Sequence, residues 1–532
     1  MSGRASDRRL YVAIGALFVA ACLPLAMWGD PRAWLLLRNT LMLAAAASVL
    51  AVPVGAALAF LLLRTDLAGR NLFLLLFGAL LLVPLYLQAA GWEAGFGRQG
   101  WFSFAHGSAA APILDGWRAV IWIHGLAAVP WVMLIVGLGL LLIEPAEEDA
   151  ALLEGSLATV LCRVTLPRAC PSIVVAAVWI LVMTGTDMTV TDLYQIRTFA
   201  EEIYLDVPDM GRISSLEPLR PTVLTQVIFV SCWTVLALVL TSKLAPPEHI
   251  PSYSTRRVYR LGVGRWVALA FVAMTLVVLI GVPLGNLIYK AGLTVEQMGA
   301  ERVRHWSVGA IAEILLDSPG RFAEEYKWSF VISALAAVAA VVVAASLAWL
   351  ARRGTWRALP ALVTSAVCLG VPGPTIGLSV IWLLHRESSP VLSYLYDYSI
   401  FAPWLAMLIK CLPITIFVSW YALRTVSDEV VEAAASEGAN WFVQFWRIGV
   451  LQHRLTLAGA ALAAFVIAFG DLAASILVIP PGVSTIPVRV FGLLHSGVDD
   501  QVAGICLTIL GGFALLACFL FAAVKTRKRP RK

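Results

Sequence analysis

The chain has 532 residues, of which 60% are apolar and only 14% are charged. Soluble domains carry about 25% charged residues, so this composition excludes an ordinary soluble protein. The eight cysteines form no CxxC pair and no close Cys/His pair, which excludes a disulfide framework and a zinc-finger type of metal site. The net charge of +6 is informative only through the places where the basic residues lie. We therefore expect a membrane protein without a resident metal.

Long apolar runs predict the membrane-spanning helices. A hydrocarbon core about 30 Å thick needs about 20 apolar residues per helix, and helical hydrogen bonds must satisfy the backbone groups inside it. The runs predict an all-α polytopic membrane protein with about twelve spans, at residues 11–28, 39–63, 71–90, 118–142, 171–190, 221–242, 266–289, 328–351, 359–384, 400–423, 455–478 and 502–524.

The N-terminal run has an alternative interpretation. Arg4, Arg8 and Arg9 precede the apolar stretch, as they do in a cleaved signal peptide, and a lipoprotein-like site ends at Cys22. The residues after Cys22 remain apolar, whereas a cleaved lipoprotein has a polar tether there. We interpret the run as an uncleaved first span.

Basic residues predict the orientation of the spans. Lys and Arg gather in cytoplasmic loops of membrane proteins. In this chain they occupy alternate loops, which places both termini in the cytoplasm. The C-terminal tail from Lys525 to Lys532 is also basic. Next to a span, such a tail indicates contact with anionic membrane lipid and not with nucleic acid. The loop residues are Arg64, Arg70, Arg163, Arg168, Lys243, Arg256, Arg257, Arg260, Arg265, Arg352, Arg353, Arg357, Arg447 and Arg454.

A long-period repeat divides the chain in two. Asp149 follows Pro130 by 19 residues, and Glu432 follows Pro413 by the same 19. In both copies the acidic residue precedes Ala-Ala and lies six residues before a glycine. We expect two parallel halves of six spans, residues 1–250 and 251–532, related by an axis along the membrane normal.

Two cytoplasmic loops, residues 144–170 and 427–454, are the most informative segments. In the second loop a Glu-Ala-Ala run favours a helix and Gly438 is suited to end it. Four aromatic residues then follow at helical spacing, between Trp441 and Trp446. The alternative to a docking element is a loop that lies against lipid headgroups. Recurrence of the pattern in both halves favours docking on another protein.

The paired loops resemble the signature Glu-Ala-Ala-x3-Gly-x9-Ile-x-Leu-Pro of permease subunits in binding-protein-dependent ABC importers. The second copy departs from it with Val450-Leu451 in place of Leu-Pro, and the first has Asp149 in place of Glu and is one residue shorter before Pro167. By this resemblance the residues that couple the chain to an ATPase are Asp149, Ala150, Ala151, Gly155, Glu432, Ala433, Ala434 and Gly438.

The resemblance implies the type I ABC importer permease fold and a set of partners. Two copies of an ABC ATPase subunit are expected, one under each coupling loop, together with an extracytoplasmic substrate-binding protein. No P-loop of the form GxxxxGK[ST] occurs in the chain. We therefore expect no cofactor on this chain, no enzymatic activity of its own, and ATP bound by the partner subunit.

The cargo follows from likeness alone. One-chain permeases with two six-span halves resemble ferric-iron importers, and more distantly those for thiamine and phosphonates. Residues 197–204 and 484–497 also look like the corresponding segments of ferric-iron permeases. Ferric iron prefers oxygen ligands, but Tyr194, Glu201, Glu202 and Tyr204 are as readily ordinary loop residues, because the binding protein would hold the metal.

Two Gly/Asp pairs are candidates for a pathway or gate. Gly185 precedes Asp187 by two residues, and Gly470 directly precedes Asp471. Ionisable groups in or near a span are costly and often line pathways. The alternative is that each aspartate caps a helix or pairs with a base such as Lys410. His124 is a second mid-span base with a structural interpretation.

Two other classes of protein fit less well. A secondary transporter with twelve spans would couple through buried ionisable sites and would not need paired docking loops. A membrane enzyme would need a catalytic constellation, and neither HExxH nor GxSxG occurs. We therefore expect the permease subunit of an ATP-driven importer that works by alternating access.

Overall fold

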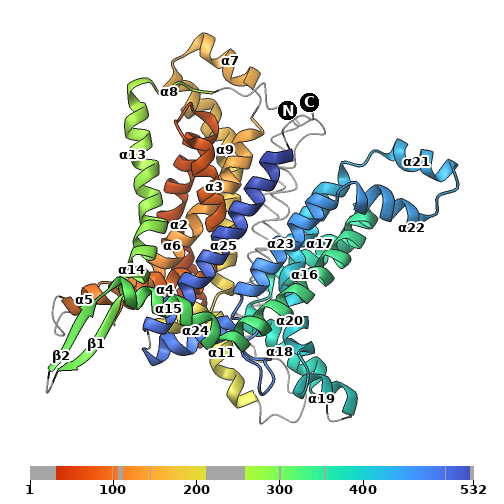
Figure 1. The fold of residues 1–532 in the computed structure, drawn as a ribbon. Helices are drawn as coiled ribbons and strands as arrows, with labels where there is room; N and C mark the ends of the chain where they lie inside the picture. The colour runs from red at the N-terminus through yellow and green to blue at the C-terminus, as the bar shows by residue number, and fades with distance from the viewer. Residues whose placement is uncertain are drawn as a thin grey trace.

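The computed structural model describes residues 31–98, 100–105, 112–143, 145–210, 258–298, 301–352, 355–386, 388–497 and 499–527. Helices dominate these residues (Figure 1). The elements up to residue 210 are α2 (Pro31–Arg64), α3 (Arg70–Leu80), α4 (Leu85–Phe96), α5 (Trp101–Ala105), α6 (Gly116–Leu141), α7 (Pro145–Glu154), α8 (Leu157–Val160), the π turn η1 (Leu161–Thr165), α9 (Leu166–Thr186), α10 (Thr189–Leu193) and α11 (Phe199–Met210).

The elements after residue 257 include one hairpin. They are η3 (Gly262–Gly264), α13 (Arg265–Leu276), the π turn η4 (Val277–Gly281), α14 (Val282–Ala291), β1 (Leu293–Met298), β2 (Glu301–Trp306), α15 (Val308–Arg321), α16 (Ala323–Ala351), α17 (Thr355–Gly370), α18 (Gly373–Leu384), α19 (Pro390–Asp397), α20 (Phe401–Arg424), α21 (Asp428–Ser436), α22 (Trp441–Val443), the π turn η5 (Gln444–Leu451), α23 (Arg454–Gly470), α24 (Ile486–Ser496) and α25 (Asp499–Arg527). Strands β1 and β2 pair antiparallel, with Leu293 opposite Trp306.

The chain is an all-α polytopic membrane protein apart from this hairpin. Within the described residues six helices are long and apolar enough to cross a membrane, and the number rises to nine if each of three bent pairs is one span. The predicted spans 11–28 and 221–242 lie outside the described residues. The six are Pro31–Arg64, Gly116–Leu141, Leu161–Thr186, Gly262–Ala291, Ala323–Ala351 and Phe401–Arg424.

The expectation of continuous helices at 71–90 and 359–384 is wrong. The first is broken between α3 and α4 with a bend of 97°, and the second between α17 and α18 with a bend of 109°. A proline begins the second arm in each case, Pro84 with ψ 148° and Pro372 with ψ 151°. Proline donates no backbone hydrogen bond and forces the residue before it out of the helical region, so the helix is interrupted there.

Two other predicted spans end early for a related reason. The predicted span 171–190 ends with α9 at Thr186, and 455–478 ends with α23 at Gly470. The aspartate that follows each helix has an extended backbone, with ψ 134° at Asp187 and 124° at Asp471. These aspartates therefore lie where the two chains leave their helices and turn.

The long helices form two groups with the same internal plan. In the first, α2 packs on α6 and α9; in the second, α16 packs on α20 and α23. Each group has its own buried core of mainly small and aliphatic side chains. Figure 1 shows the groups diverging toward the end of the molecule that carries α7 and α21. The coupling loops thus project from the same end of the molecule.

The two groups meet at the opposite end. There α4 packs on α14, α24 and α25, and α11 packs on α18. One buried cluster joins Tyr86 and Leu87 of α4 to Leu287 of α14, Val490 of α24 and Cys506 of α25. Helices from both predicted halves therefore share this core, although the boundary at residue 250 remains a prediction because 211–257 lie outside the described residues.

Candidate functional site: two coupling loops and a central seam

The second coupling loop is a helix–turn–helix. Helix α21 ends in two backbone bonds that close a Schellman motif, from Gly438 N to Ala435 O at 2.9 Å and from Ala439 N to Ala434 O at 2.9 Å. Gly438 has φ +86°, the left-handed conformation that this motif requires and that glycine adopts without steric cost. Asn440 then caps α22 by accepting a hydrogen bond from Val443 N at 2.9 Å. The predicted glycine stop is confirmed in its geometry.

The second loop presents its signature residues to the outside. Glu432, Ala433 and Gly438 are exposed, and Ala434 is half-buried. Phe442 is also exposed, at 63% of its surface, although it is a large apolar side chain. An exposed acid beside small and aromatic residues is suited to contact another protein.

The first loop repeats this pattern of exposure with a different turn. On α7, Asp149 and Ala150 are exposed and Ala151 is half-buried, as on α21. Gly155 does not take a left-handed backbone, unlike Gly438, and a Cβ there would meet Thr159 Cβ at 3.3 Å. The two loops therefore offer similar faces on differently shaped turns.

A buried acid that the motif did not identify holds the first loop. Glu148 is fully buried and pairs with Arg64 at the end of α2, while its other oxygen accepts a hydrogen bond from Thr165 at 2.8 Å. In the second loop the residue before the signature acid is Val431, buried in an apolar cluster with Trp349. The run of three acids at 147–149 gave no signal of which one is buried.

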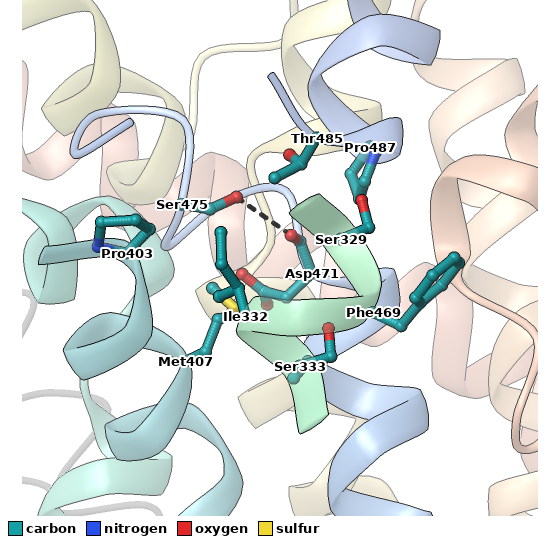
Figure 2. A pocket seen from close by; sticks show the side chains of 11 residues that line it. Ser329, Ile332, Ser333, Pro403, Met407, Phe469, Asp471, Ser475, Thr485 and Pro487 are labelled. Carbon is teal, nitrogen blue, oxygen red and sulfur yellow. Dashed lines mark hydrogen bonds between the residues drawn. The ribbon is translucent and has the colours of Figure 1, made fainter. Parts of the chain in front are cut away.

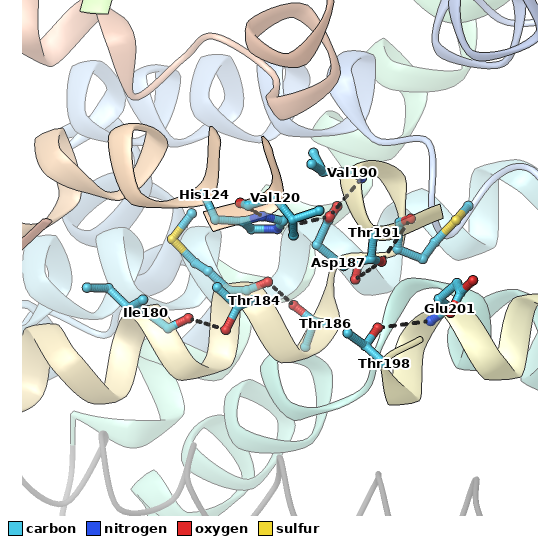
Figure 3. Close-up of polar contacts among 12 residues, drawn as sticks. Val120, His124, Ile180, Thr184, Thr186, Asp187, Val190, Thr191, Thr198 and Glu201 are labelled. Carbon is cyan, nitrogen blue, oxygen red and sulfur yellow. Dashed lines mark hydrogen bonds and ion pairs between the residues drawn. The ribbon is translucent and has the colours of Figure 1, made fainter. Parts of the chain in front are cut away.

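Asp187 occupies the turn after α9 (Figure 3). Its Oδ2 accepts a hydrogen bond from Val190 N at 3.1 Å and lies 3.2 Å from His124 Nε2. His124 Nδ1 contacts the Val120 carbonyl at 2.9 Å, so Nδ1 must carry a proton. The His124 ring thus bridges the Val120 carbonyl of α6 and the carboxylate of Asp187.

Asp471 occupies the equivalent turn after α23. Its Oδ1 accepts a hydrogen bond from Ala474 N at 2.8 Å, and its Oδ2 lies 3.5 Å from Lys410 Nζ on α20. It also lines a small pocket with hydroxyl groups from Ser329, Ser475 and Thr485 (Figure 2). Both aspartates therefore cap a backbone amide and contact a basic side chain, which is the alternative to a pathway role that the sequence left open.

These two turns are built alike. Each aspartate caps the backbone three residues on and contacts a basic side chain from the proline-containing helix of its group, His124 of α6 or Lys410 of α20. Pairing removes most of the cost of a carboxylate inside a membrane protein. The side-chain exposures of 13% for Asp187 and 11% for Asp471 leave each group only a small accessible surface.

The two turns meet in one apolar cluster at the seam between the groups. We call it the seam cluster: Met188, Ala200, Leu472, Ala473 and Phe491. Every member is less than a tenth exposed. The cluster therefore closes the space between the groups at the end opposite the coupling loops.

Gly470 brings the second turn against the first group. A Cβ on Gly470 would lie closer than 3.0 Å to the ring of Pro84, nearer than side-chain carbons approach. Gly185 is buried in the last turn of α9, just before Asp187. Of the four predicted pathway residues, the structure thus brings Gly470 and both aspartates to the seam or directly beside it.

The Gly470→Ala variant is expected to lose about 1–3 kcal/mol of unfolding free energy, because a methyl group must displace the rigid Pro84 ring. The measurement is thermal unfolding of the purified chain in detergent. Gly459→Ala on the same helix is the control, since a Cβ there meets nothing within 4 Å. Alanine favours a helix over glycine, so Gly459→Ala should be at least as stable as the parent. Equal stability of both variants would contradict the close contact at Pro84.

The outer oxygen-bearing residues have structural partners. Tyr194 donates to Glu93 at 2.6 Å, and Glu202 is paired with Arg32 and with Arg197, the latter at 3.1 Å. Burial raises the pKa of Glu201 to about 7. Among the described residues no group of three or more His, Cys, Asp or Glu is arranged to hold a metal ion. Tyr194 therefore joins the end of α10 to α4, and Glu202 joins α11 to Arg32 of α2.

A polar contact also crosses the seam. His495 on α24 lies 3.2 Å from Asp192 on α10, and this hydrogen bond raises the pKa of His495. His495 is 42% exposed, so solvent screens the pair and its contribution to stability is small. The contact helps to orient α10 against α24, whereas burial of the seam cluster stabilises the interface.

The described fold is that of a multi-pass membrane protein, and the comparison with known proteins finds a likeness to the permease protein of a transport system. The chain is 26% identical over 230 residues to the putrescine transport system permease protein PotI of Escherichia coli strain K12, and equally to PotI of strain O6:H1. The match covers 42% of this chain and 80% of PotI, so PotI is little more than half as long. No protein-family profile matches the chain.

Proposed function

We propose that this chain is a two-half permease of an ATP-driven importer, in the bacterial inner membrane, with both termini in the cytoplasm. The observation that carries the proposal is the pair of exposed loops at α7 and α21 on one end of the molecule. A relative about half as long as this chain supports a duplicated unit. A secondary transporter would have no use for two such loops.

The proposed mechanism is alternating access. A loaded binding protein docks at the end opposite the loops, where the seam cluster closes the path. ATP closes two copies of a separate ABC ATPase, which draw the loops at Asp149 and Glu432 together. The two groups of helices then pivot, so that the seam opens outward, and hydrolysis of ATP resets it. Asp187 and Asp471 act at the gate, each paired with a basic side chain on α6 or α20.

The proposed cargo is ferric iron, delivered by the binding protein. Its support is the likeness of residues 197–204 and 484–497 to segments of ferric-iron permeases. A second cargo, the diamine putrescine, is favoured by the name of the relative. Ferric iron would enter as cargo and not as a resident metal.

Uptake by membrane vesicles that hold the chain with its ATPase and binding protein tests both levels of the proposal. ATP-dependent uptake of labelled ferric iron that is lost in Glu432→Lys would support the class and the cargo. ATP-dependent uptake of labelled putrescine without iron would keep the class and replace the cargo. Absence of ATP-dependent uptake of iron, putrescine, thiamine and phosphonate would overturn the proposed function.

A further inference from the structure

The end of α2 makes contacts in two directions. Toward the first coupling loop, Arg64 pairs with Glu148 of α7, and Glu148 also accepts the hydrogen bond from Thr165 of η1. The side chains of Arg64 and Glu148 are 1% and 0% exposed. The pair therefore joins three elements through buried charges that have no access to water.

Residues 258–265, near the start of the second predicted half, pack over the end of α2. Tyr259 forms a parallel bridge with Thr65, with hydrogen bonds from Tyr259 N to Arg64 O at 2.8 Å and from Asp66 N to Tyr259 O at 3.1 Å. Asp66 then accepts hydrogen bonds from Leu261 N at 2.9 Å and from Arg265 at 2.8 Å. The segment is thus fixed to α2 through both its backbone and a side chain.

The ring of Tyr259 covers the buried pair. It stacks on Phe60 with centroids 5.8 Å apart, and the Arg64 guanidinium carbon lies 6.0 Å from its centre. Burial, followed by the negative charge of Glu148, raises the pKa of the Tyr259 hydroxyl. The phenol therefore shields the ion pair while it remains protonated.

The second coupling loop is held by different chemistry. Val431 takes the place that Glu148 has in the first loop, inside a cluster that includes Trp349, Leu423 and Ile448. Arg352 at the end of α16 lies over the Trp349 ring at 4.5 Å and 3.3 Å from Asp428, whose side chain is 78% exposed. Apolar packing thus replaces the buried ion pair there.

We propose that Glu148 is the anchor of the first coupling loop, meaning the residue that fixes α7 to the end of α2, and that residues 258–265 hold this anchor in place. A displacement of α7 is then also transmitted to α13 of the other predicted half. Glu148 and Tyr259 are positioning residues that act through α7, not contacts for the ATPase. This inference rests on the proposed function. Under it, the two ATPase subunits face unequal sockets, and the first socket is linked directly to the opposite half.

The chemistry predicts how the anchor fails. Glu148→Gln keeps the shape and the hydrogen bond with Thr165 but leaves Arg64 buried without a counter-charge. Removing one partner of a buried pair is strongly destabilising, whereas replacing both with apolar groups is often neutral. The double variant Arg64→Met/Glu148→Leu imitates the apolar second loop and should restore the anchor that Glu148→Gln loses.

Hydrogen–deuterium exchange of the purified full chain tests the anchor without reference to transport. In Glu148→Gln, amides of residues 145–165 should exchange about tenfold faster, while those of 428–451 are unchanged. Tyr259→Leu should also accelerate exchange at 145–165, although it lies in the other predicted half. The Arg64→Met/Glu148→Leu variant should return exchange there to near the parent rate. The control Arg98→Gln removes an ion pair in which Arg98 is 68% exposed and should change neither region.

The complete complex in proteoliposomes supplies the second readout. Cargo moved per ATP hydrolysed should fall about fivefold or more in Glu148→Gln and in Tyr259→Leu, and recover in the double variant. Unchanged exchange at 145–165 in Glu148→Gln or in Tyr259→Leu would overturn the inference. The variants could show the expected exchange pattern while the parent complex shows no ATP-dependent uptake. That result would support the anchor and overturn only the proposed function.

Discussion

Replacing Gly438 with proline is expected to abolish ATP-coupled uptake while the chain still inserts into the membrane. Proline fixes φ near −65°, whereas Gly438 has φ +86° and donates a backbone hydrogen bond to Ala435 at 2.9 Å. The Schellman turn between α21 and α22 would be lost, and with it the shape of the exposed face that includes Glu432. Transport should fall by about 100-fold or to background, because the second ATPase subunit loses its socket.

The matched control for this prediction is Gly438→Asn. Asparagine tolerates the left-handed region better than other residues with a side chain, and a Cβ at this position meets nothing within 4 Å. We expect Gly438→Asn to keep most of the uptake. The measurements are uptake by vesicles and, in the same preparation, ATP hydrolysis with and without the loaded binding protein. Full transport by Gly438→Pro would refute the docking role of the second loop.

Replacing Lys410 with methionine is expected to lower the free energy of unfolding by about 3–5 kcal/mol, because Asp471 would remain buried without its counter-charge. The Asp471 side chain is 11% exposed, so water cannot replace the ammonium group 3.5 Å away. The same variant should reduce uptake sharply, since the turn after α23 forms part of the closed seam.

The double variant Lys410→Met/Asp471→Asn separates loss of charge balance from loss of shape. Asparagine still caps Ala474 N but carries no charge, so most of the lost stability should return. Lys327→Met is the control for a lost lysine, because its ion pair with Glu324 is exposed and is worth about 0–1 kcal/mol. The measurement is denaturant or thermal unfolding in detergent. A single variant as stable as the parent, or a double variant as unstable as the single, would contradict the proposed pairing.

Much of the architecture could be predicted because it depends on local chemistry. Apolar runs of sufficient length identify α2, α6, α16 and α20, since a helix satisfies the hydrogen bonds of its own backbone in lipid. Gly438 was predicted to stop a helix, because the left-handed turn it makes depends on the residue itself. The capping and pairing of Asp471 was one of the alternatives that the sequence left open, since Lys410 lies in the preceding span.

The helix breaks at Pro84 and Pro372 could not be predicted from local sequence. Both prolines lie inside apolar runs that predict single spans, 71–90 and 359–384. A single proline can kink a helix slightly or break it, and the packing around it selects the outcome. Here the second arms α4 and α18 turn to pack at the seam, which no local pattern specifies.

The chain's sequence by itself determined the all-α membrane class, and it predicts the repeat and the two coupling loops, because hydrophobicity, helix stops and motif spacing are properties of neighbouring residues. Only the tertiary structure decided that Glu148 and not Asp149 is buried, that Gly470 meets Pro84, and that Tyr259 closes over Arg64. Each of these facts joins residues at least 84 positions apart, and adjacent acids are equivalent until a distant partner reaches one of them.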